Sequence, residues 1–209
     1  MKKLTRQQIV DAAVANGLEP AALRAVIAVE SGGSGYIADG RVKILFERHV
    51  LWKRLHTRGI DPRPLAEALP GLCGSRWDPT TYPYGKSGAN QYTRIQHVLD
   101  WASANDPAHW ESYKKAAYEA CSWGLFQMMG YHYQACGYAN VYTLKHAFEE
   151  SEANQLAAIL TWMGGNGLLT KLEQKQWRAF VRGYNGSGRV DHYTEKLLAA
   201  YERAKTGGT

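Results

Sequence analysis

A stripe of apolar residues that ends in a carboxylate is the feature that most constrains this chain. The spacing i, i+3, i+4, i+7 places four residues on one helix face, and these are Leu23, Val26, Ile27 and Glu30. Pro20 favours the first turn of this helix, and Gly32-Gly33 ends it. Glu30 is therefore expected in the last helical turn, at the edge of the core that the stripe faces.

The predicted position of Glu30 has a chemical consequence. A partly desolvated carboxyl near the negative end of a helix dipole favours its protonated form. A raised pKa of this kind suits a general acid at neutral pH. The alternative is a helix-terminal Glu that turns outward into solvent, as surface Glu residues commonly do.

Composition favours a globular chain with an anionic partner. The 209 residues are 45% hydrophobic and carry a net charge of +6, with a pI near 9.2. Nucleic acid, anionic lipid and bacterial cell wall would all suit this charge. The N-terminus lacks an apolar secretory stretch, and no run of about 18 apolar residues occurs, so we expect synthesis in a cytoplasm. Three cysteines without a CxxC pair fit a reducing compartment.

Most of the chain has helical periodicity. A capping box at Thr5 and Gln8 opens a first helix, and an Asp-Gly turn flanked by apolar residues predicts a small β-hairpin over residues 35–46. Five prolines and scattered aromatic residues predict that 59–92 is a loop-rich insertion over a substrate groove. The alternative for this segment is a domain linker. Further helices are marked by Ile95, Val98, Leu99 and Ala102; by Leu156, Ile159, Leu160 and Met163; by Trp177, Phe180, Val181 and Tyr184; and by Leu197, Leu198 and Tyr201. The prediction is a mostly α-helical single domain over 1–209.

Three short motifs add a resemblance. Glu30-Ser31, the run Gly124-Leu125-Phe126-Gln127-Met128 and the run Gly183-Tyr184-Asn185-Gly186 occur in this order. They resemble the signature motifs of the lysozyme-like superfamily, found in soluble lytic transglycosylases and goose-type lysozymes. Together with Ile44–His49, Gln91-Tyr92 and Ser122-Trp123, they look like the N-acetylmuramidase domain of bacteriophage endolysins, over about residues 18–203.

The resemblance implies a lysozyme-like fold, with the β-hairpin directly after the catalytic helix, and roles for individual residues. Ser31 would orient the Glu30 carboxyl, Gln127 would hydrogen-bond substrate or place Glu30, and Tyr184 with Asn185 would hydrogen-bond near the acid. For each, a structural role stays open: a helix-end hydroxyl, a satisfied core amide, and a core Tyr with a capping Asn. Sugar faces stack on aromatic rings, so Trp123 is also a candidate wall of the cleft.

Glycoside hydrolysis requires a proton donor and stabilisation of an oxocarbenium-like centre, so a second carboxylate would decide the mechanism. Glu47, after an apolar strand, and Asp39, in the hairpin turn, are the candidates. Asp-Gly is also good turn chemistry, and Glu47 could be a helix N-terminal charge. If neither serves, the enzyme would be a lytic transglycosylase, in which a hydroxyl of the sugar attacks and leaves a 1,6-anhydro end.

Two other enzyme classes and a binding module fit the sequence less well. The seven histidines form no HExxH motif, so a zinc amidase is not favoured, and the cysteines suit core or loop positions better than a cysteine peptidase. A basic wall- or nucleic-acid-binding module fits the charge but gives no reason for Glu30 on an apolar stripe.

The sequence therefore predicts a muramidase without metal or cofactor, cleaving the β-1,4 bond between N-acetylmuramic acid and N-acetylglucosamine. It is expected to be a monomer that binds peptidoglycan glycan strands and no nucleic acid, with electrostatic attraction to anionic wall or membrane. The missing signal peptide fits an endolysin that accumulates in the host cytoplasm and reaches the periplasm when a holin opens the membrane.

Overall fold

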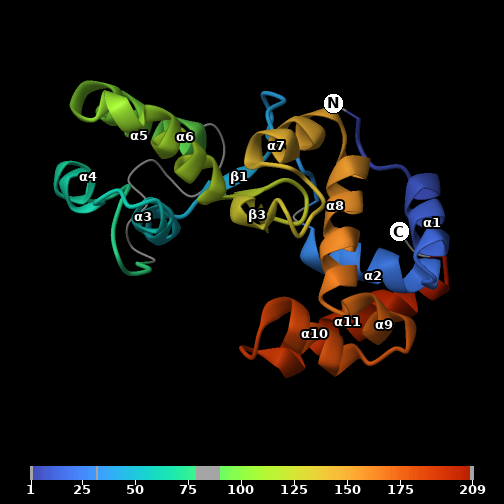
Figure 1. Ribbon diagram of the computed structural model, residues 1–209. Coiled ribbons are helices and arrows are strands. Elements are labelled where there is room, and N and C mark those ends of the chain that lie inside the picture. The colour runs from blue at the N-terminus through green and yellow to red at the C-terminus, as the bar shows by residue number, and fades with distance from the viewer. Residues whose placement is uncertain (1, 32, 79–89, 208–209) are drawn as a thin grey trace.

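The computed structural model describes residues 2–31, 33–78 and 90–207. Its helices form two groups with a small sheet between them (Figure 1). One group holds α3 (Arg48–Thr57), α4 (Arg63–Ala68), α5 (Asn90–Asn105) and α6 (Trp110–Glu119). The other holds α1 (Arg6–Ala15), α2 (Pro20–Glu30), α8 (Glu152–Gly165), α9 (Leu168–Glu173), α10 (Trp177–Asn185) and α11 (Val190–Lys205), and α7 (Val141–Glu150) lies near the sheet.

The helix starts follow local signals in the sequence. The Thr5 side chain accepts a hydrogen bond from the Gln8 N–H while Gln8 caps the Thr5 N–H, which completes the predicted capping box. Pro20 occupies the first turn of α2, and the Ser151 hydroxyl caps α8 by accepting from the Asn154 N–H. α2 packs along α11 and against α1, so the stripe that leads to Glu30 faces the core of the second group.

The sheet is larger than the predicted hairpin. Strands β1 (Ile44–Phe46), β2 (Cys121–Trp123) and β3 (Met128–Met129) form a three-stranded antiparallel sheet in the order β1-β2-β3. Ile44 pairs with Trp123, far along the chain, and Ser122 pairs with Met129. The hairpin after α2 is reduced to a single antiparallel bridge between Tyr36 and Val42. The mostly helical fold with a small antiparallel element after α2 is confirmed, while the long-range pairing of β1 was not predicted.

The core spans both helix groups and the sheet. The residues predicted to mark the later helices are buried or partly buried, with one correction: Leu198 is 39% exposed, because it lies one position outside the buried stripe of α11. The segment after Gly59 contains α4 and contributes buried Leu65 and Leu72 to the core. The part of the predicted insertion over 79–89 lies outside the described residues. All three cysteines are buried and unbridged.

Among the described residues, no single helix is long and apolar enough to cross a membrane; α1 and α2 pass such a test only as a pair, which is bent by 119°.

Candidate functional site

Glu30 is the last residue of α2, as predicted, and its carboxyl is partly buried. Burial raises its pKa above the usual value, and this effect outweighs the opposing influences of Asn185 and Lys196. The Asn185 Nδ2 group donates a hydrogen bond of 3.0 Å to Glu30 Oε1. Two positions that are 155 residues apart in the sequence therefore meet at one carboxyl.

The partner of Glu30 comes from the end of α10. This helix is strongly amphipathic and buries Phe180 and Val181, which fixes the direction of its last turn. Tyr184 stacks on Phe180 with ring centroids 5.6 Å apart and meets Trp162 edge-on at 5.8 Å. Burial and the nearby Glu30 charge raise the Tyr184 pKa, so the phenol stays neutral. Gly186 follows at φ +79°, a conformation that glycine adopts readily, and ends the helix.

Ser31 caps the C-terminus of α2. Its backbone N–H donates to the Ile27 carbonyl at 2.9 Å, and its backbone is extended, so the chain turns away from the helix directly after Glu30. Ser31 therefore directly follows Glu30 as the C-cap of α2, through its backbone; a role of its hydroxyl in orienting Glu30 stays a prediction.

Glu47 lies on the other helix group, where β1 ends and α3 begins. Its N–H donates to the Ala120 carbonyl at 3.0 Å, which ties this junction to the end of α6. Burial raises its carboxyl pKa, with Arg94 opposing, and His49 Nδ1 lies 3.6 Å from Glu47 Oε2. Glu47 is therefore a partly buried carboxylate in a setting comparable to that of Glu30.

Asp39 has a different environment. Its carboxylate accepts hydrogen bonds from the backbone N–H and the guanidinium of Arg41, with the ion pair at 2.6 Å. These contacts lower its pKa. The side chain is 43% exposed, in the turn between Tyr36 and Val42. This geometry is that of a turn residue, the structural role left open by the sequence.

The two candidates from the β2–β3 segment point inward. Trp123 has 0% exposure, and its indole N–H donates to the Tyr118 carbonyl at 2.9 Å, so no ring face is free to stack on a sugar. Burial in the sheet thus overturns its predicted place in the cleft wall. Gln127 donates to the Gly124 carbonyl at 2.8 Å and accepts from the Ser122 hydroxyl at 3.0 Å. These contacts favour a satisfied core amide that holds the turn after β2.

Two buried polar residues of α8 were missed by the sequence analysis. Glu152 accepts from the backbone N–H groups of Gly35 and Leu4, both at 2.8 Å. Gln155 accepts from the Leu125 N–H at 2.7 Å. α8 thereby anchors both the segment after Glu30 and the turn after β2. The i, i+3 spacing of Glu152 and Gln155 was visible in the sequence. Their hydrogen-bond partners, however, are distant backbone N–H groups, which leave no signal in the sequence.

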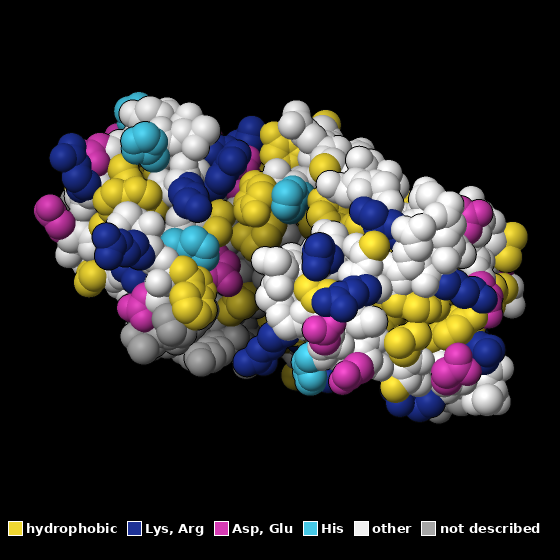
Figure 2. Space-filling model, turned by 90° about the horizontal axis from the view of Figure 1, so that it is seen from below, with side chains coloured by type: hydrophobic (Ala, Val, Ile, Leu, Met, Phe, Trp, Pro, Cys, Tyr) yellow, Lys and Arg dark blue, Asp and Glu magenta, His cyan; other side chains and the backbone are white. Residues whose placement is uncertain are grey.

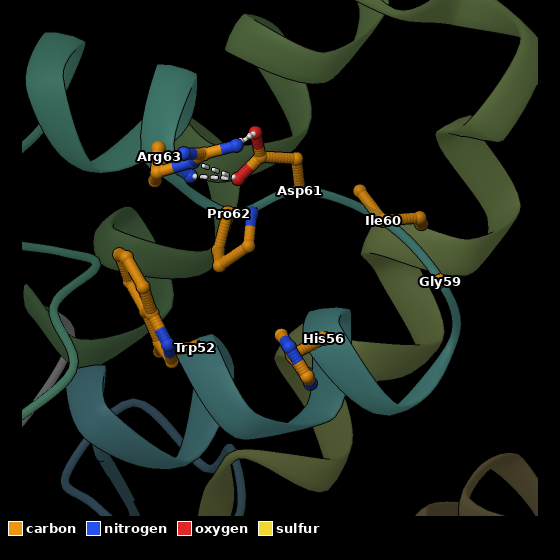
Figure 3. Close-up of a pocket in the computed structure, with 7 residues that line it drawn as sticks. All are labelled: Trp52, His56, Gly59, Ile60, Asp61, Pro62 and Arg63. Carbon is orange, nitrogen blue, oxygen red and sulfur yellow. Dashed lines mark hydrogen bonds and ion pairs between the residues drawn. The ribbon is translucent and has the colours of Figure 1, made fainter.

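Figure 2 shows that the surface is hollowed between the two helix groups. Glu47 precedes α3 in one group, and Glu30 ends α2 in the other. A separate open pocket of about 580 Å³ lies on α3 and the segment before α4. There, Trp52 and His56 project from α3 toward Pro62, beside the Asp61–Arg63 ion pair (Figure 3). None of the predicted site residues lines this pocket.

The chain matches one family model and is similar to solved structures. The N-acetylmuramidase family model matches residues 19–205. A crystal structure of a Burkholderia AP3 phage endolysin is similar, with a TM-score of 0.82 and 34% sequence identity over 98% of this chain and 73% of that chain. No curated protein sequence matches significantly. Because the family model covers most of the sequence, this chain belongs to the N-acetylmuramidase family.

Proposed function

We propose that this chain is a peptidoglycan-degrading muramidase of the phage endolysin type. It hydrolyses the β-1,4 bond between N-acetylmuramic acid and N-acetylglucosamine, and Glu30 is its general acid. The single observation that carries this proposal is the partly buried Glu30 carboxyl with a raised pKa, held by Asn185 at 3.0 Å. The family membership and the similarity to an endolysin support the same substrate.

In this proposal, the two carboxyl oxygens of Glu30 have different roles. Asn185 Nδ2 can only donate, so Glu30 Oε1 accepts and the proton of the neutral acid resides on Oε2. Oε2 then delivers the proton to the leaving glycosidic oxygen, as general acid catalysis requires. Burial keeps a larger fraction of Glu30 protonated at neutral pH than an exposed Glu would have.

For the second carboxylate we favour Glu47 over Asp39. Glu47 is held at the start of α3 on the opposite helix group, whereas the Asp39 carboxylate is engaged by Arg41. Glu47 would activate a water or stabilise the oxocarbenium-like centre. A carboxyl separation of about 6.5–9.5 Å in the substrate complex would correspond to inversion, and about 5–5.5 Å to retention.

The test is product analysis on purified peptidoglycan with wild type, Glu30→Gln, Glu47→Gln and Asp39→Asn. Mass spectrometry should find reducing N-acetylmuramic acid ends with wild type and none with Glu30→Gln. Loss in Glu47→Gln with retention in Asp39→Asn would support the assignment of Glu47. Products lighter by one water, with 1,6-anhydro ends, would instead identify a lytic transglycosylase, and an absence of sugar cleavage would refute both.

We further propose that the chain acts as a monomer on the wall in the periplasm, after holin-dependent release from the host cytoplasm. The net charge of +6 supports electrostatic attraction to an anionic wall or membrane surface.

A further inference from the structure

A cationic pocket lies on α10, the helix that ends at Asn185. It has a volume of about 480 Å³, within the range of small-molecule sites, and lies between α10 and the start of α11. Arg178, Arg182, Arg189 and His192 line it, together with Asp191. In Figure 2, basic, acidic and histidine side chains gather at this edge of the hollow.

The pocket is connected to Glu30 through α10. Arg182 and Asn185 are three residues apart on this helix, so their side chains are neighbours on one face. Asn185 itself contacts Glu30 at 3.0 Å. A group bound by Arg182 would therefore lie beside the substrate's scissile region and not on a remote surface.

Two of the arginines are available for a ligand. Arg178 pairs with Asp191 at 3.1 Å, which neutralises one charge of each sign. Within the described part of the chain, Arg182 and Arg189 form no ion pair with an acidic side chain, and both are exposed. Arg189 also adopts a left-handed backbone at φ +54°, an uncommon conformation for a residue with a side chain. Such conformations often occur where a side chain is directed toward a ligand.

These observations indicate the class of ligand. Planar guanidinium groups match carboxylates with paired hydrogen bonds. In peptidoglycan, the carboxylates belong to the short peptides that branch from N-acetylmuramic acid, next to the bond under attack. A phospholipid headgroup fits less well, because membrane-binding sites pair basic residues with exposed apolar ones. The one apolar residue of this pocket, Val190, is only 7% exposed.

We propose that Arg182 and Arg189 bind a carboxylate of the stem peptide, so that the enzyme prefers glycan strands that carry stem peptides over bare strands. This inference rests on the proposed muramidase function and adds a substrate preference to it.

The test compares two soluble substrates, glycan strands with tetrapeptide stems and the same strands after an amidase has removed the peptides. Wild type should show a kcat/KM about five- to tenfold higher on the peptide-bearing strands, as two partly exposed charge pairs would contribute. The double variant Arg182→Gln/Arg189→Asn should bring this ratio close to one. Asn at position 189 tolerates the left-handed backbone.

The matched control is Arg6→Gln/Arg203→Gln, which removes the same two charges from exposed positions on α1 and the far end of α11. It should leave the substrate ratio at the wild-type value. An equal fall in the ratio for both double variants would overturn the inference, since general attraction to an anionic polymer would then explain it. Circular dichroism checks that each variant is folded.

A second measurement does not depend on any variant. The free tetrapeptide should inhibit wild type on peptide-bearing strands, and the same peptide with amidated carboxylates should not. Equal inhibition by the two peptides would overturn the inference, and so would equal wild-type rates on both strands. It would also be overturned if the Arg182→Gln/Arg189→Asn variant lost binding to phosphatidylglycerol vesicles without a change in the substrate ratio. These outcomes would leave the proposed function standing. Failure of wild type to cleave either strand would overturn the proposed function itself.

Discussion

Replacing Glu119 by Gln should weaken the helix group that carries Glu47. Glu119 is the last residue of α6, and its side chain has 0% exposure. Its two oxygens accept from Arg54 Nε at 2.6 Å and from an Arg58 Nη at 2.7 Å, so one buried carboxylate joins α6 to the second half of α3. A Gln amide could accept from one arginine but would direct its NH₂ group at the other guanidinium.

The magnitude follows from this geometry. Removing one partner of a buried ion pair costs about 3–5 kcal/mol. The Arg54 and Arg58 side chains are 28% and 17% exposed, so water can partly solvate them, which favours the low end, about 3 kcal/mol. For a chain of this size, that loss corresponds to a Tm lower by about 6–12 °C.

Urea unfolding followed by circular dichroism measures this free energy. Glu111→Gln is the matched control, because Glu111 lies on the same helix but its side chain is 71% exposed. The free energy of unfolding should fall by less than about 1 kcal/mol in Glu111→Gln. A loss of less than about 1 kcal/mol for Glu119→Gln would refute the reasoning, since the buried pair would then contribute no more than a surface charge.

Four further results are expected. Glu30→Gln should unfold at a higher urea concentration than wild type at neutral pH, because the charged, buried Glu30 carboxylate destabilises the folded state once the pH rises through its raised pKa. The difference should vanish in acid, below the pKa that Glu30 has in the unfolded chain. Asn185→Leu should move the alkaline limb of the kcat/KM profile to higher pH, because a donor that lowers the Glu30 pKa is lost, and an unchanged limb would contradict this. Gly124→Ala should cost about 1–3 kcal/mol, because φ is +71° and a Cβ would lie 2.6 Å from Gln155 Oε1, whereas Gly165→Ala, with open space around it, should not. Raising the salt concentration should reduce activity on whole walls, and a rate independent of salt would argue against electrostatic attraction.

The parts of the fold that local sequence specifies were predicted well. Thr5 and Gln8, Pro20 and Ser151 act on backbone groups within a few residues, so the helix starts could be placed without knowledge of the rest of the chain. The apolar stripe similarly placed Glu30 at the end of α2, at the edge of the core.

The features that depend on distant contacts were not predictable in this way. β1 pairs with β2 across a separation of more than seventy residues, and Trp123 of β2 is fully buried, with its indole N–H bound to the Tyr118 carbonyl. Gln127 was recognised as an amide in an apolar run, but its partners come from a turn whose shape the sequence does not specify. Glu119 also escaped notice, because a lone Glu at a helix end is uninformative until Arg54 and Arg58 lie against it.

The proton-donor role of Glu30 is the central claim, and leaving-group dependence tests it most directly. The measurement is kcat/KM for wild type and Glu30→Gln on a natural glycan strand and on a dinitrophenyl glycoside of the same disaccharide, whose leaving group departs without protonation. General acid catalysis predicts a loss of about 10²–10⁴-fold on the natural strand and a far smaller loss on the dinitrophenyl substrate. Equal losses on both substrates, with Glu30→Gln still folded, would contradict the assignment of Glu30 as the acid.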